Sequence, residues 1–204
     1  FDLPKKKDLI KYSKLKKKYD IPKKYFYIPN QFWKHKNHEI IIETLKFLQK
    51  KRERINIILT GYPYDHRHKN HFNEIITKVK TYNLKKNFIY LGVLPYIDAM
   101  SLMYNSMGVI NPSKFEGCSS SVEQSKSMGK KIILSNINIH KEQNPVYSYY
   151  FKPDNYKQLA KILVNISKNY NRKSDLSSID KAYKNLNHRL KNYALKYQNE
   201  VLKI

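Results

Sequence analysis

Short apolar runs alternate along the chain with longer amphipathic segments. The apolar runs cover residues 25–28, 55–59, 88–91, 109–110, 131–134 and 146–151, and they are rich in Ile, Val, Leu, Tyr and Phe. Such runs are typical of buried strands, whereas residues 39–51 place Ile41, Leu45 and Leu48 on one helical face. The alternation predicts βαβ units and an α/β fold, a Rossmann-like doubly wound parallel sheet of about six strands.

Further helices are predicted between and after these strands, at residues 8–19, 69–82, 97–105, 119–128 and 153–169. Residues 174–204 form one or two C-terminal helices, with a break near residues 171–174. Gly129 directly follows the helix predicted at 119–128 and is the residue type expected at a helix C-cap. The 204 residues can bury one sizeable core, so we expect a single domain over residues 1–204.

Composition narrows the protein class. No apolar run approaches the roughly 20 residues that a membrane-spanning helix needs, and residues 1–7 lack the apolar segment of a secretory signal. The lone Cys118 excludes a disulfide framework and a cysteine-based zinc site. We therefore expect a cytoplasmic protein in a reducing compartment.

The chain carries a formal net charge of +24, from 40 Lys and Arg against 16 Asp and Glu. This excess suggests polyanionic partners, yet only five of the 40 basic residues are Arg, the residue that usually reads bases and phosphates. A solvated basic face, or attraction to an anionic membrane, fits this bias better than specific nucleic-acid binding. The run from Lys16 to Lys18 fits the same two interpretations.

One segment carries candidate chemistry, residues 111–124 after the fourth predicted strand. No GxGxxG, GxxxxGK[ST] or GxSxG motif occurs, which excludes three common nucleotide-binding and hydrolase signatures. In residues 111–124, Glu116 and Gly117 precede a predicted helix whose first N–H groups can bind an anion such as a diphosphate. In the alternative interpretation, the serines at 119–121 only cap the helix and Glu116 is a surface carboxylate.

Residues 27–38, 88–95 and 111–129 together resemble the C-terminal, nucleotide-sugar-binding domain of GT-B-fold retaining glycosyltransferases of family 4. The similarity extends from about residue 19 to residue 161, with the three motifs in the family's order. It implies transfer of a hexose from a nucleoside diphosphate sugar to an acceptor with retention of configuration, in glycan or polysaccharide synthesis. It also implies that no cofactor or metal is needed.

The resemblance assigns roles to particular residues. Glu116 matches the first Glu of the family's E-x7-E motif, which addresses the donor sugar, and Lys36 matches the lysine that neutralises the diphosphate. Val93 and Leu94 match the stretch whose backbone contacts the nucleobase. The loop that meets the sugar and diphosphate corresponds to Gly117, Cys118, Ser119, Ser120 and Ser121.

Two positions depart from the family pattern. The second Glu of the motif, which holds the ribose, is Gln124 here, while Glu123 lies one residue earlier and about 100° around the helix. An arginine that often precedes the lysine by five residues is replaced by Gln31, so Lys34 or His35 has to supply that charge. An inactive nucleotide-sugar-binding domain therefore stays open beside the enzyme, as does a basic nucleic-acid-binding module.

The resemblance also implies an N-terminal acceptor domain, for which 204 residues leave no room. We therefore expect a fragment or one half of a split enzyme.

Several other side chains could have a functional role, but a structural role explains each of them more simply. His66, His68 and His71 could bind zinc, but two of them lie in a polar loop with one adjacent carboxylate. Phe32 and Trp33 fit core packing better than stacking on a base. His140 fits a solvated helix start.

Overall fold

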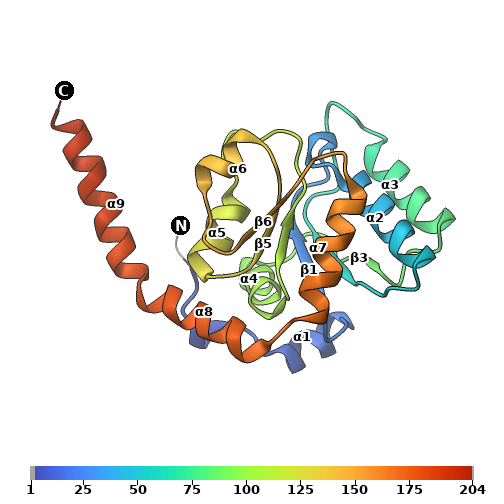
Figure 1. Ribbon diagram of the computed structural model, residues 1–204, viewed down its shortest axis with the longest axis horizontal. Helices are drawn as coiled ribbons and strands as arrows, with labels where there is room; N and C mark the ends of the chain where they lie inside the picture. The colour runs from blue at the N-terminus through green and yellow to red at the C-terminus, as the bar shows by residue number, and fades with distance from the viewer. Residues whose placement is uncertain (1–2, 204) are drawn as a thin grey trace.

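The computed structural model describes residues 3–203 and contains a parallel sheet with helices on both faces (Figure 1). The strand order is β3-β2-β1-β4-β5-β6 and each neighbouring pair is parallel. This is the doubly wound order, and it confirms the predicted Rossmann-like fold. The strands are β1 Phe26–Pro29, β2 Ile57–Thr60, β3 Phe88–Tyr90, β4 Val109–Asn111, β5 Ile132–Ser135 and β6 Ser148–Phe151.

Helices connect the strands and continue the chain after the sheet. Their bounds are α1 Tyr12–Tyr19, α2 His38–Lys50, α3 His71–Thr81, α4 Tyr96–Asn105, α5 Ser120–Met128, α6 Asn138–Gln143, α7 Tyr156–Lys168, α8 Arg172–Lys184 and α9 Leu186–Val201. Two short 3-10 helices add Lys6–Asp8 and Lys34–Lys36. Among the helices of residues 3–203, none is long and apolar enough to cross a membrane.

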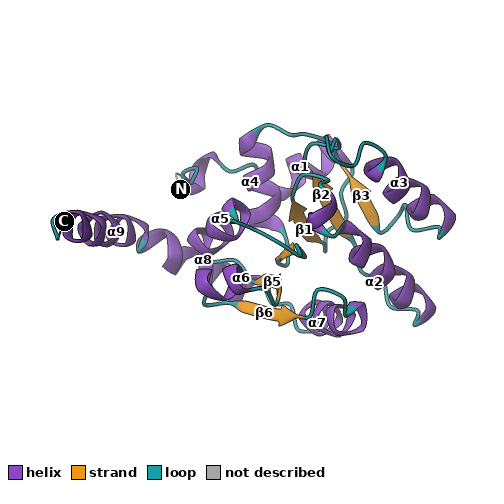
Figure 2. Ribbon diagram, turned by 90° about the horizontal axis from the view of Figure 1, so that it is seen from above, coloured by secondary structure: helices purple, strands orange, loops and turns teal. Residues whose placement is uncertain are grey.

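Side chains of β1 alternate between two apolar clusters, as the period of a strand requires. Phe26 and Ile28 belong to the cluster that also contains residues of α2, α3 and α7. Tyr27, and Tyr25 directly before the strand, belong to the cluster with residues of α1 and α4 on the other face. Figure 2 shows α1 and α4 on one side of the sheet and α2 and α7 on the other. Both faces of the sheet are therefore buried.

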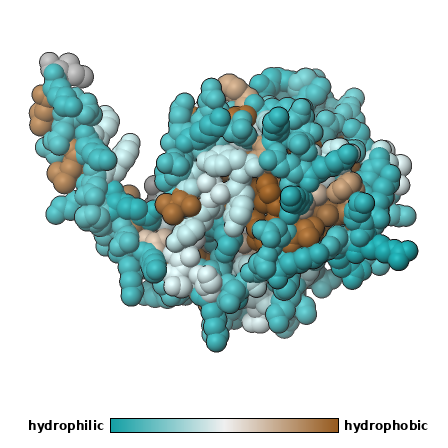
Figure 3. All heavy atoms as spheres, in the orientation of Figure 1, coloured by the Kyte–Doolittle hydropathy of each residue, from teal (hydrophilic) through white to brown (hydrophobic). Residues whose placement is uncertain are grey.

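The C-terminal helices differ in how they meet this body. Lys130 and Asp175 are both completely buried, and their ion pair, with Nζ 2.9 Å from Oδ2, ties α8 to the start of β5. Helix α9 buries no residue and projects away from the sheet (Figure 1), with hydrophobic atoms exposed along it (Figure 3). The prediction of one or two C-terminal helices is confirmed, but the break lies at residues 169–171 rather than near 171–174, so α8 begins at Arg172. Residue 204, the last of the predicted segment, lies outside the described residues.

Several local predictions need correction, among them the starts of β2 at Ile57 rather than residue 55 and of α7 at Tyr156 rather than residue 153. Helix α1 begins at Tyr12 rather than residue 8, because residues 6–8 form a separate 3-10 turn. Helix α6 was predicted only as a helix start at His140, since its six residues are too few for an apolar period, and it begins at Asn138. Strand β6 begins at Ser148, two residues later than expected, and Val146 is 85% exposed.

Candidate functional site

A hollow of about 340 Å³ lies where the loops after β1 and β4 meet. The strand order reverses between these two neighbouring strands, and ligands of doubly wound sheets bind at this point, outside the carboxyl ends of the strands. We call it the switch-point hollow. It is lined by Pro29, Asn30, Gln31, Trp33, Lys36, Cys118, Ser119, Ser120 and Ser121.

Lys36, which lines this hollow, forms an ion pair with Glu116, which lies outside the lining and 80 residues away in the chain. The lysine Nζ lies 2.7 Å from Oε1 and 2.8 Å from Oε2 of the carboxylate, and the side chains are 14% and 5% exposed. Burial acts to raise the pKa of Glu116, but hydrogen bonds from Lys36 and Ser113 more than offset it, so the pKa lies below its usual value. Glu116 is therefore a charged, fixed carboxylate.

Two buried asparagines hold the walls of the hollow together. Asn30 Nδ2 donates to Asn111 Oδ1 at 3.3 Å, and Asn111 Nδ2 donates to Ser119 Oγ at 2.7 Å. Ser121 Oγ closes the ring by donating to Asn30 Oδ1 at 3.3 Å. The sequence analysis assigned no such role to Asn30 and Asn111. Their position at the carboxyl ends of β1 and β4, where ligands of such sheets bind, could have indicated it.

The first turn of α5 lines the same hollow. Ser119 is its N-cap residue but makes no capping hydrogen bond, because its Oγ accepts from Asn111 instead. The first N–H groups of the helix therefore have neither an intrahelical partner nor a side-chain cap. Cys118 and Gly117 are exposed, and a Cβ added at Gly117 would meet no atom within 4 Å. An anion can approach this backbone without obstruction.

The remaining predicted site residues lie outside the lining of the hollow. The backbone N–H of Lys34 donates to Asp65 at 2.9 Å, and Lys34 lines a different hollow with His68 and His71. Val93 is 66% exposed in the loop after β3, and Leu94 packs against the cluster of α1 and α4.

The two candidate ribose residues have different surroundings in α5. Gln143 Nε2 donates to Glu123 Oε1 at 3.0 Å, and Lys126 Nζ lies 3.8 Å from the same oxygen. The Gln124 side chain is half-buried and forms no hydrogen bond with any residue of the described range. Glu123 is thus engaged with α6, whereas Gln124 keeps its hydrogen-bonding groups available.

Of the aromatic and histidine side chains near the site, some belong to the hydrophobic core and others line the switch-point hollow. Phe32 is fully buried, as expected, and its ring stacks on His38 at 4.1 Å. Trp33, expected in the core, lines the hollow instead, with the Arg67 guanidinium 5.7 Å from its ring. The expectation of a solvated His140 is wrong: it is completely buried, and its Nδ1 bonds to the Ser135 carbonyl at 2.9 Å.

A metal site would need several ligands at one point. His71 is buried at the start of α3, while His66 and His68 are exposed in the preceding loop. Within residues 3–203, no three His, Cys, Asp or Glu residues are arranged to hold a metal ion. The zinc alternative for the three histidines therefore has no support in the geometry.

Solved structures share this fold. A glycosyltransferase from Rickettsia africae ESF-5 matches with a TM-score of 0.68 and 20% identity, over 95% of this chain and 53% of that one. Anabaena Alr3699/HepE in complex with UDP matches with a TM-score of 0.73 and 16% identity, over 95% and 54%. The C-terminal domain of a group 1 glycosyl transferase (LpcC) from Francisella tularensis gives 0.64 and 18%, over 87% and 91%. The chain thus spans about half the length of the first two proteins.

Sequence comparison identifies the family. No curated protein sequence matches the chain significantly. The model of the family described as "Glycosyl transferases group 1" matches residues 11–194, which is most of the sequence. The chain belongs to the group 1 glycosyl transferases.

Proposed function

We propose that this chain is the donor-binding domain of a retaining, family 4 GT-B glycosyltransferase. It binds a nucleoside diphosphate sugar in the switch-point hollow and, with an acceptor domain outside this chain, transfers a hexose to a growing glycan. The observation that carries the proposal is the Lys36–Glu116 pair beside the uncapped N-terminus of α5. The reaction needs neither a metal nor another cofactor, and its compartment is the cytoplasm.

The ammonium group of Lys36 can bind a phosphate oxygen of the donor as well as Glu116. An ammonium group carries three N–H donors, and two of them meet the oxygens of Glu116. The third has no partner within the described residues and is available to a phosphate oxygen. Together with the dipole of α5, this charge stabilises the departing diphosphate, which is where negative charge develops in the transfer.

The other predicted residues complete the donor site. Glu116, fixed by Lys36 and Ser113, orients the hexose, and Gln124 hydrogen-bonds the ribose with less strength than a carboxylate would. The backbone of Val93 and Leu94 meets the base. Gln31 lines the hollow without a charge, so Lys36 is the principal cation for the phosphates.

Titration calorimetry with nucleotides tests the proposal. UDP is the first ligand to try, because Anabaena HepE is described in complex with UDP and with UDP-glucose, and ADP, GDP and dTDP with their sugars follow. Lys36→Ala should weaken diphosphate binding by about 1.5–3 kcal/mol, the contribution of a hydrogen bond to a charged group, and barely affect the bare nucleoside. Lys161→Ala is the matched control, because Lys161 is exposed on α7 and does not belong to the predicted donor site.

Two outcomes would overturn the assignment. Equal losses for nucleoside and diphosphate in Lys36→Ala would mean that the lysine acts through the structure of the site. If no nucleotide or nucleotide sugar binds below millimolar concentration while a random RNA oligomer does, the chain is a nucleic-acid-binding module instead.

A further inference from the structure

Six basic side chains gather at the edge of the sheet opposite the switch-point hollow. They come in pairs just before the three strands β1, β2 and β3, and all six are exposed. We call this surface the basic edge; its residues are Lys23, Lys24, Arg52, Arg54, Lys85 and Lys86. Because the amino ends of parallel strands meet at one edge of the sheet, sequence positions more than 60 residues apart become one surface.

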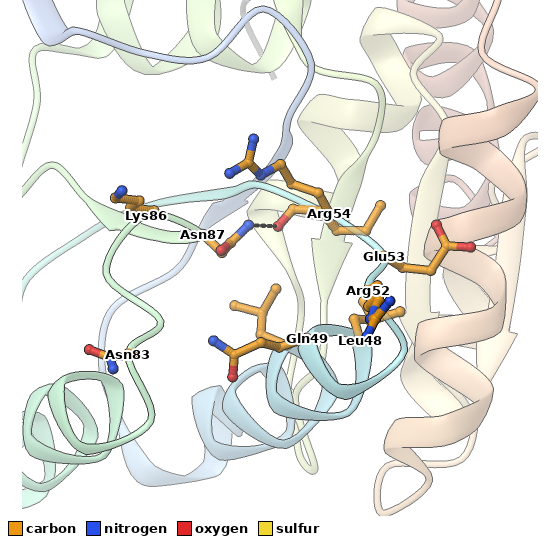
Figure 4. Close-up of a pocket in the computed structure, with 10 residues that line it drawn as sticks. Leu48, Gln49, Arg52, Glu53, Arg54, Asn83, Lys86 and Asn87 are labelled. Carbon is orange, nitrogen blue, oxygen red and sulfur yellow. Dashed lines mark hydrogen bonds between the residues drawn. The ribbon is translucent and has the colours of Figure 1, made fainter.

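Hydrogen bonds between the three strand entries fix this arrangement. Asn56 Nδ2 donates to the Lys24 carbonyl at 3.1 Å, and Asn87 Nδ2 donates to the Ile55 carbonyl at 2.7 Å. Figure 4 shows the second bond with Arg54 and Lys86 on the segments that it joins, and Arg52 at the end of α2. Arg52, Arg54 and Lys86 line a hollow of about 290 Å³ at this surface. Three adjacent strands span roughly 10 Å, so the backbone positions of Lys23, Lys24 and Lys85 lie on the same side of the sheet.

These charges have no ion-pair partner among residues 3–203. None of the six forms an ion pair in the described part of the chain, and Glu53, the acidic residue inside these segments, binds Lys168 at 2.6 Å. Lys130 and Lys36, in contrast, are each matched to a buried carboxylate. A cluster of unpaired, exposed cations attracts an extended anionic partner strongly.

We propose that the basic edge docks the protein on an anionic lipid bilayer. A negatively charged membrane attracts exposed basic residues without requiring them to take up one particular arrangement. This suits the flexible lysine and arginine side chains at the amino ends of β1 to β3. Single-stranded nucleic acid would need aromatic side chains for its bases to stack on, and none of the three segments carries an exposed one. No large apolar side chain is exposed in them either, so the attachment is electrostatic and reversible.

Docking in this orientation leaves the switch-point hollow free. The hollow lies outside the carboxyl ends of β1 and β4, whereas the basic edge lies at the amino ends of β1 to β3. A nucleotide could enter from the aqueous side while the edge faces the membrane. The proposal stands independently of what the hollow binds.

Vesicle flotation tests the docking with the whole chain. It should bind phosphatidylcholine vesicles that contain phosphatidylglycerol, bind pure phosphatidylcholine vesicles weakly, and dissociate as salt is raised. The variant Lys24→Gln/Arg54→Gln/Lys86→Gln should lose affinity on the order of 100-fold at low salt. Its melting temperature and circular dichroism check the fold, and Lys86→Glu alone repeats the test with one exposed change.

The matched control removes the same charge from the opposite edge. Lys114, Lys141 and Lys152 are exposed and follow the carboxyl ends of β4, β5 and β6, so Lys114→Gln/Lys141→Gln/Lys152→Gln should bind vesicles nearly as well as the unchanged chain. Equal losses in both triple variants, or no binding to the anionic vesicles, would refute the proposal. Tighter binding of single-stranded RNA than of vesicles, lost in the same variant, would assign the edge to nucleic acid. UDP titration of each variant reports on the switch-point hollow separately.

Discussion

Two lysines that pair with buried carboxylates, Lys130 and Lys36, differ in how many hydrogen-bond acceptors surround the ammonium group. Lys130 is enclosed completely: its Nζ contacts both oxygens of Asp175 and the carbonyls of Ser106 and Tyr104. Burial lowers its pKa to about 8 despite the carboxylate. Lys36 has Glu116 alone and stands at the wall of a hollow. A saturated ammonium stabilises the fold, whereas an unsaturated one can bind a ligand.

His38 is a buried titratable residue whose charge the fold does not accommodate. It is fully enclosed at the start of α2, its ring stacks on Phe32, and both ring nitrogens lack hydrogen-bond partners. Burial, with a smaller effect of His71 and Lys36, lowers its pKa from 6.5 to about 3. The unfolded chain therefore binds a proton between these values that the folded chain does not.

Stability should consequently fall as the pH drops below about 6.5, by on the order of 4 kcal/mol near pH 3 from His38 alone. His38→Phe keeps the ring stack and removes the titration, so its advantage in unfolding free energy over the unchanged chain should grow with acidity. Urea unfolding between neutral pH and about pH 4 measures this difference. His188→Phe, at an exposed position of α9, is the control, and a similar growth there would contradict the explanation.

Contacts between individual side chains were the least predictable feature of the structure from the sequence. Residue types at the ends of β1 and β4 indicated the correct loops, and a family resemblance singled out Lys36 and Glu116. Their direct pairing, and the ring through Asn30, Asn111 and Ser121, depend on two strands becoming neighbours. Contacts across about 80 residues are set by tertiary packing, which no local pattern encodes. His140 was misjudged although its partner, the Ser135 carbonyl, is only five residues away, because its complete burial is a matter of tertiary packing.

Elements were more predictable than contacts, because periodicity and capping are local properties. Each predicted strand exists, and Gly129 ends α5 with a φ of 74°, a left-handed conformation that favours glycine. The structure adds a second reason for this glycine. A Cβ there would lie 2.7 Å from both the Ala182 Cβ and the Ser178 carbonyl oxygen, so α8 packs directly against it.

Gly129→Ala should therefore destabilise the protein twice over. The left-handed backbone costs about 1–2 kcal/mol with a side chain, and the displacement of α8 adds about 1–3 kcal/mol. Gly92→Ala separates the two effects, because Gly92 has a φ of 79° and open space around its Cβ position. Chemical denaturation of both variants gives the comparison, and equal losses would show that the contact with α8 is too soft to matter.

At the scale of the whole molecule, the parallel sheet has two ends with different surfaces. The carboxyl ends of the strands meet at the switch-point hollow, and the amino ends carry the basic edge. Since every strand runs in the same direction, the fold itself separates these surfaces. The body between them is closed by α8 through Lys130 and Asp175, and α9 continues beyond it.

Helix α9 should accordingly lie outside the cooperative unit of folding. Leu186 packs against the core cluster of α1 and α4, and Arg189 donates to the Ser127 and Ala182 carbonyls. The residues of α9 after Arg189 are not buried and add nothing to the core. A lone helix of about 15 residues is only marginally stable in water. Deleting residues 190–204 should thus change the unfolding free energy by less than about 1 kcal/mol, while helical circular dichroism decreases.

In the unchanged chain, amides of α9 should exchange with solvent much faster than those of β1 and β4. A loss of several kcal/mol on deletion, or slow exchange along α9, would instead mean that this helix packs against the body in solution.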